Sequence, residues 1–183
     1  GVAREVAAIT AAELTLLAID PIPGEIEDRL DVNVTAPAAC PLYCGRIVRD
    51  INLDVLTPLW IAQRLERSGI RSINPVVDIT NYVLLETGQP MHAFNLAKIT
   101  EVLQVRYAFS HEKIQLLNGN EIDLNSDMLL ITDAHKPLAL AGIMGGLDSG
   151  VTQGTKDIFL ESAFFALAAI SGKSFCLGFS SDS

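Results

Sequence analysis

Helix-like segments give way to strand-like segments near residue 100 of this 183-residue chain. Two early segments open with an N-cap residue followed by proline, at Thr57-Pro58 and Asn74-Pro75, and close at Gly69 and Gly88. The later segments are short apolar runs separated by turn residues. Helices followed by a series of strands predict an α+β fold and not a parallel βαβ winding. We expect a layered β/β/α sandwich with mixed, largely antiparallel strands.

Hydrophobic periodicity and turn residues also predict the individual helices and strands. Helices are expected over residues 2–17, 57–69, 75–88 and 166–176, and strands over 31–36, 43–49, 101–109, 113–117, 121–124, 128–132, 137–146 and 158–165. The DPIPG sequence at residues 20–24 breaks any regular element. We therefore expect residues 1–38 to be a helical segment and linker left from an adjoining domain, and residues 39–183 to form one domain.

Composition narrows the class of protein. The chain is 49% hydrophobic and 19% charged, which favours a compact globular domain, and its net charge of −9 opposes the phosphate contacts that dominate nucleic-acid binding. Three cysteines without a completing Cys or His pair indicate reduced thiols and no zinc site. The sequence contains no membrane-length apolar run, so we expect a cytoplasmic protein. Because it lacks an initiator methionine, it looks like a piece of something larger.

Polar residues in apolar surroundings are the first candidates for a site. Thr80 and Asn81 interrupt an otherwise apolar helix; they face solvent, bond back to the preceding turn, or line a site. His92 follows the break after that helix, which can turn its imidazole toward Asn81; the alternative is a packed, satisfied histidine. His111 and His135 lie in turn-like contexts, and we assign them no function.

The second half adds glycines and one carboxylate. Gly142, Gly145 and Gly146 lie where a strand turns, and they either admit a ligand or simply form a tight turn. Strand alternation puts Glu161 on the same face as Phe159, where a carboxylate needs a partner or acquires a raised pKa. The alternative is a Glu161 on an edge strand or facing solvent. Spacing alone assembles no catalytic triad, acidic pair or metal cluster.

Several motifs recur together in one known family. They are GIRSINPVVDITNYVLLETGQPMHAFNL from residue 69, ALAGIMGG from residue 139, FLES from residue 159 and GVAREVAAIT at the start. In order and spacing they resemble the editing module of the β subunit of bacterial phenylalanyl-tRNA synthetase, over most of the chain from about residue 40. The first segment resembles the end of that subunit's N-terminal domain.

The resemblance implies that the chain hydrolyses tyrosine wrongly esterified to tRNA(Phe), as part of a phenylalanine-tRNA ligase. It implies a tRNA(Phe) 3′ end carrying tyrosine and an α subunit in a heterotetramer as partners. It implies no cofactor in this chain, with ATP and Mg used by the parent enzyme. The matching pocket positions are Thr80, Asn81, His92, Ala141, Gly142, Glu161 and Ser181.

Each position has an implied role. Glu161 would accept a hydrogen bond from the phenol, and a site built to bond that hydroxyl rejects the analogue that lacks it. Ala141 and Gly142 would leave room for the ring, while Thr80 and Asn81 would hold the ammonium and carbonyl groups. His92 would orient water or act as general base toward the ester.

The C-terminal segment departs from the family. Similar proteins have an arginine-rich stretch leading to Thr-x-Ala, whereas this chain has SGKSFCLGFSSDS. Lys173 is the one basic residue of this segment, and Ser181 stands in place of the threonine. The alternative is therefore a non-catalytic scaffold or subunit-contact module that has lost editing. A free-standing deacylase is a third hypothesis, which the acidic composition disfavours.

Overall fold

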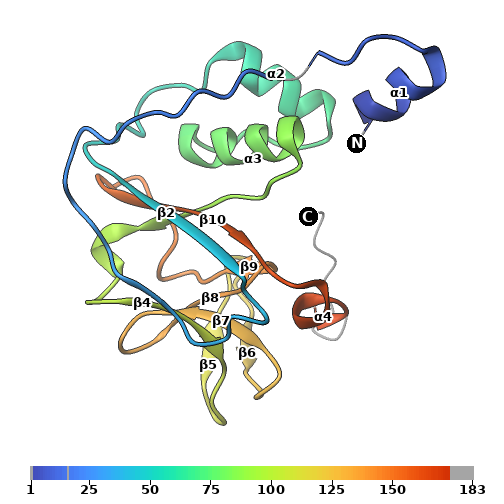
Figure 1. Ribbon diagram of the computed structural model, residues 1–183. Coiled ribbons are helices and arrows are strands. Elements are labelled where there is room, and N and C mark those ends of the chain that lie inside the picture. Colours follow the sequence, from blue (N-terminus) through green and yellow to red (C-terminus); the bar gives the residue numbers. More distant parts are fainter. Residues whose placement is uncertain (1, 16, 174–183) are drawn as a thin grey trace.

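The computed structural model describes residues 2–15 and 17–173, and its layers are two sheets and a pair of helices (Figure 1). Helices α2 (Leu59–Arg67) and α3 (Pro75–Thr87) cover a sheet with the order β2-β10-β3. The other face of that sheet packs on a second, five-stranded sheet. The expected α+β class and β/β/α layering are confirmed.

The first sheet is antiparallel and central to the molecule. Its strands are β2 (Leu42–Val48), β10 (Ile158–Phe164) and β3 (His92–Asn95). Its middle strand, β10, is hydrogen-bonded on both sides, so the residues of β10 that point toward the second sheet are enclosed.

The second sheet has the order β1-β4-β7-β8-β9, in which only β1 and β4 run parallel. Its strands are β1 (Val32–Val34), β4 (Leu103–Tyr107), β7 (Leu129–Thr132), β8 (Pro137–Leu140) and β9 (Met144–Gly145). The remaining elements are the hairpin of β5 (Lys113–Gln115) and β6 (Glu121–Asp123), the 3₁₀ turn η1 (Leu96–Lys98), and the helices α1 (Val2–Thr10) and α4 (Leu167–Ile170).

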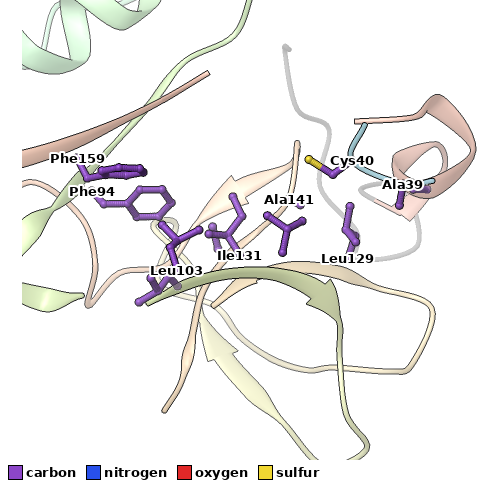
Figure 2. Packing of buried hydrophobic residues seen from close by; sticks show 12 residues of the cluster. Ala39, Cys40, Phe94, Leu103, Leu129, Ile131, Ala141 and Phe159 are labelled. Atoms are coloured by element: carbon purple, nitrogen blue, oxygen red, sulfur yellow. The ribbon is translucent and has the colours of Figure 1, made fainter. Parts of the chain in front are cut away.

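The main core lies between the two sheets. Figure 2 shows Phe94 and Phe159 of the first sheet above Leu103 and Ile131 of the second, and all four are almost completely buried. Fully burying a side chain of this size contributes about 1.5 to 3 kcal/mol. The core thus fixes how the two sheets face each other, and with it the position of everything on their inner faces.

Helix α3 begins and ends as expected. The Asn74 side chain accepts a hydrogen bond from the Val77 amide at 3.0 Å, Pro75 occupies the first turn, and Gly88 ends the helix at φ +80°. By contrast, the expected N-cap role of Thr57 in α2 is wrong. The Thr57 hydroxyl donates to the buried carboxylate of Asp78 on α3, and α2 begins after Pro58 without a side-chain cap.

Several expected boundaries were too wide. Helix α1 ends at Thr10 and not near residue 17, because it buries no residue and Ala11 takes a left-handed φ of +54°. Residues 137–146 form two strands, β8 and β9, joined by a turn. Helix α4 stops at Ile170, and the part of the expected helix beyond residue 173 lies outside the described residues.

Strand β3, which carries His92, was not expected from the sequence. Its four residues are too few to show a periodicity, and only the pairing with β10 makes them a strand. None of the helices in the described part of the chain combines the length and apolar character needed to cross a membrane.

Candidate functional site

A cavity of about 490 Å³ opens between the C-terminal half of α3 and the inner faces of the two sheets. Five expected site residues line it, although they come from four separate stretches of the chain: Thr80, Asn81, His92, Gly142 and Glu161. Apolar side chains, including Leu84, Ile131, Met144 and Phe165, form much of the remaining wall. The structure thus brings together a mostly apolar pocket with a few polar groups, the usual composition of a small-molecule site.

Helix α3 contributes Thr80 and Asn81. Thr80 is buried, and its hydroxyl donates to the carbonyl oxygen of Val77 at 2.8 Å, so it bonds back to the preceding turn while also lining the cavity. Since that bond uses its proton, the hydroxyl is left as an acceptor toward the cavity. Asn81 is half-buried and offers both a donor and an acceptor.

His92 lies on β3 with its Nε2 buried and without a hydrogen-bond partner. Burial lowers its pKa to about 4, so the imidazole is neutral at physiological pH. The ring packs edge-on against Phe94, with centroids 4.5 Å apart. A β-carbon added at Gly145 of β9 would lie 2.6 Å from His92 Cε1, so this glycine makes room for the ring.

Glu161 lies in the middle of β10, directly opposite Gly45 on β2 and His92 on β3. Only 5% of the residue is exposed, and its Oε2 has no hydrogen-bond partner. Burial raises its pKa to about 8, an effect that the neighbouring Tyr43 hydroxyl opposes. The solvent-facing alternative is therefore wrong, and the shared face with Phe159 is confirmed.

The turn between β8 and β9 supplies Gly142. Its φ of +67° lies in the left-handed region, and a β-carbon there would come within 3.1 Å of Phe165 and 3.3 Å of Ile170. This glycine serves both the turn and the space beside it. Ala141 does not line the cavity, because its side chain points into the core between the sheets (Figure 2). Ser181 lies outside the described residues.

Sequence reasoning missed Tyr43 and the reason for Gly145. Tyr43 lies on β2 and interacts with Glu161, which is more than a hundred residues away in the chain. No local pattern signals such a pair, because strand pairing alone brings the two together. Gly145 was noted as a position of close approach, but the approaching group, the His92 ring, is visible only in the fold.

Comparisons with known proteins agree on one family. Residues 39–183 match the B3/4 domain family. The phenylalanine–tRNA ligase β subunit of Nitrosospira multiformis is 60% identical over the whole chain, and that of Vibrio parahaemolyticus is 52% identical. The chain spans 24% and 23% of the length of these two relatives.

A solved structure has a similar fold. An N-terminal fragment of the phenylalanyl-tRNA synthetase β subunit from Pyrococcus horikoshii matches with a TM-score of 0.58. The match covers 82% of this chain and 47% of the other, at 17% sequence identity.

Proposed function

Because the chain belongs to the B3/4 domain family, we propose that it is the editing portion of a phenylalanine–tRNA ligase β subunit, which hydrolyses tyrosine from mischarged tRNA(Phe). In this proposal, residues 39–183 form the editing domain and residues 1–38 belong to an adjoining one. The cavity receives the tyrosyl ester at the tRNA 3′ end. An α subunit completes the parent enzyme, which uses ATP and Mg elsewhere for aminoacylation.

The observation that carries this proposal is the buried carboxyl group of Glu161 in the wall of a mostly apolar cavity, with its Oε2 unpartnered. Buried polar groups usually have a partner, so an unpartnered carboxyl group in a cavity wall points to a ligand with a hydrogen-bonding group. A phenol supplies that group at the end of an apolar ring. A phenyl ring would leave the carboxyl unpaired, at a cost of about 1 to 3 kcal/mol.

The remaining lining residues fit the other end of a tyrosyl ester. The acceptor oxygen of Thr80 and the amide of Asn81 suit the ammonium and the carbonyl groups. Gly142 leaves space for the substrate, since a larger residue would meet Phe165 and Ile170.

Hydrolysis needs a positioned water molecule. The water oxygen attacks the ester carbonyl carbon, and the bond from that carbon to the ribose oxygen breaks. One proton of the water passes to the ribose oxygen, and the other leaves with the carboxylic acid product. A pKa of about 4 makes His92 a weak base at neutral pH, so we assign its Nε2 to orienting the water through a hydrogen bond. The ester is already activated, and orientation therefore supplies much of the effect.

The test is deacylation of Tyr-tRNA(Phe) by the full-length enzyme that contains this chain. We expect Glu161→Ala to lower kcat/KM for this substrate about 10-fold to 100-fold, consistent with a lost hydrogen bond to a buried group. Gly142→Trp should abolish deacylation, because the indole fills the cavity. Unchanged deacylation in both variants would overturn the assignment.

Matched controls come from exposed positions. Glu66→Ala removes an exposed carboxylate from α2, and Gly154→Trp adds an indole where a β-carbon would meet no atom within 4 Å. Both should deacylate at the wild-type rate. The non-catalytic alternative predicts that mischarged tRNA stays intact even with the wild-type enzyme, so the wild-type reaction separates the two functions.

A further inference from the structure

Tyr43 and Glu161 lie on the same inner face of the first sheet. Tyr43 pairs with Ala163, and Glu161 pairs with Gly45, so the two are diagonal neighbours on adjacent strands. Tyr43 Oη and Glu161 Oε2 are both buried, and neither has a hydrogen-bond partner. A buried tyrosine hydroxyl usually finds one. Two unpartnered polar groups on neighbouring strands are therefore candidate partners for each other.

The two groups already interact through space. Burial, and then the charge of Glu161, raise the pKa of Tyr43 well above its ordinary range. Burial raises the pKa of Glu161, and the Tyr43 hydroxyl counteracts part of that rise. Neither atom meets hydrogen-bond geometry in this structure, so one of the two side chains has to reorient to complete the bond.

Among the described residues that surround Glu161, Tyr43 is the donor on the side away from the cavity. Tyr43 does not line the cavity, whereas Glu161 does. The position opposite Glu161 on β2 is Gly45, and a β-carbon there would overlap the ring of Phe159. His92, opposite on β3, faces the cavity itself. Tyr43 can therefore bond one carboxyl oxygen and leave the other for a ligand.

We propose that Tyr43 is a positioning residue for Glu161: its hydroxyl donates to one carboxyl oxygen and turns the other toward the ligand. The terminal torsion of a glutamate side chain is broad, so a second partner is needed to fix it. This inference rests on the proposed function for the nature of the ligand, a tyrosyl group. Tyr43 touches no reacting atom and acts through Glu161 alone.

The kinetic test uses Tyr43→Phe in the full-length enzyme with Tyr-tRNA(Phe). We expect KM to rise about fivefold to 20-fold with kcat nearly unchanged, because the hydroxyl serves binding of the phenol and not the chemical step. In a Glu161→Ala background, Tyr43→Phe should cause no further loss. Tyr107→Phe, at an exposed tyrosine of β4, removes a hydroxyl elsewhere and should leave KM at its wild-type value.

The outcomes distinguish the positioning role of Tyr43 from the proposed editing function. If Tyr43→Phe leaves kcat/KM within twofold of wild type, or lowers it equally with and without Glu161, the positioning role is wrong while the editing function stands. If the wild-type enzyme itself leaves Tyr-tRNA(Phe) intact, the proposed function fails.

A second readout does not depend on deacylation. The titratable groups that face Glu161 are Tyr43, Cys40 and His92, and burial keeps all three neutral between pH 5 and 9, with the pKa of Cys40 raised to about 11 and that of His92 lowered to about 4. The carboxyl ¹³C signal of Glu161 in the 183-residue chain should therefore titrate as a single group. Tyr43→Phe should move its midpoint to higher pH, and an unmoved midpoint would contradict the contact.

Discussion

Two buried titratable residues share one cavity, and burial moves their pKa values in opposite directions. Burial raises the pKa of Glu161 to about 8 and lowers that of His92 to about 4. At pH 7 the cavity wall therefore carries a mostly protonated carboxyl group and a neutral imidazole. A cavity of this kind can receive a neutral aromatic ring without a charge left unpaired beside it.

This arrangement makes a prediction about stability and pH. Glu161 has a higher pKa in the folded chain than its ordinary value of 4.5, so the folded state binds more protons between pH 4.5 and 8. The free energy of unfolding associated with Glu161 is therefore greatest below pH 4.5 and falls as the pH rises toward 8. We expect Glu161→Gln to be more stable than wild type at pH 8, by up to several kcal/mol, since one pKa unit corresponds to about 1.4 kcal/mol.

Urea denaturation between pH 4.5 and 9 measures this difference. The difference in free energy of unfolding between Glu161→Gln and wild type should increase with pH and level off above about pH 8. His92→Gln is the complementary variant, because the lowered pKa of His92 costs wild-type stability only as the pH falls from its ordinary value of 6.5 toward 4. A constant gap for Glu161→Gln across the range would show that its carboxyl is not buried in solution.

The close approach of Gly145 to His92 makes a second prediction at this scale. In Gly145→Ala the new methyl group would lie 2.6 Å from His92 Cε1 and 2.8 Å from Nε2, so the imidazole has to move. We expect deacylation to fall about tenfold or more, since a shift near 1 Å in a positioning group has a large effect. Gly154→Ala, which adds a methyl group in open space, should retain wild-type activity. If Gly145→Ala deacylates as fast as Gly154→Ala, the position of His92 does not matter for the reaction.

At the scale of elements, helix α3 is held in place by one of its own side chains. The carboxylate of Asp78 is fully buried and accepts hydrogen bonds from the Thr57 hydroxyl, the Ser72 hydroxyl and the Ile73 amide, the last at 2.8 Å. These donors lie before α2 and between α2 and α3. The bonds join both connections to the helix that carries Thr80 and Asn81.

Replacing this carboxylate should destabilise the chain and loosen the cavity wall. Asp78→Ala removes a buried acceptor shared by the Thr57 hydroxyl, the Ser72 hydroxyl and the Ile73 amide, and we expect a loss of about 2 to 4 kcal/mol in the free energy of unfolding. Asn74→Ala removes only the N-cap and should cost about 1 kcal/mol. Urea denaturation of both variants, with Asp20→Ala at an exposed position as control, measures these free energies of unfolding. If Asp78→Ala loses no more stability than Asn74→Ala, Asp78 does not hold α3 in place.

At the scale of the whole molecule, charge limits how the chain can hold RNA. A net charge of −9 repels phosphates. In the proposed enzyme, other parts of the ligase therefore make most of the contacts that bind tRNA.

The corresponding prediction concerns the 183-residue chain alone. We expect it to bind tRNA(Phe) more weakly than about 10 µM at 100 mM salt, as measured by fluorescence anisotropy, because it provides few cationic contacts. Tight binding that weakens steeply with added salt would show a phosphate-binding surface on this chain.

The sequence by itself determined the class of fold and the ends of α3. Proline after Asn74 and glycine at residue 88 act through local backbone geometry, which neighbouring residues fix without help from the rest of the chain. It also identified four stretches that meet in the cavity, since their residue types are unusual in their local context. The boundaries of α1 and α4 failed because short helices depend on packing that no local pattern records.

Only the tertiary structure decided which polar groups are buried and what faces them. Strand pairing sets Glu161 opposite His92 and beside Tyr43, and the second sheet closes over all three. The raised pKa of Glu161, the lowered pKa of His92 and the need for glycine at residue 145 all follow from that enclosure. Burial depends on residues distant in the sequence, and the chemistry of a buried group depends on burial.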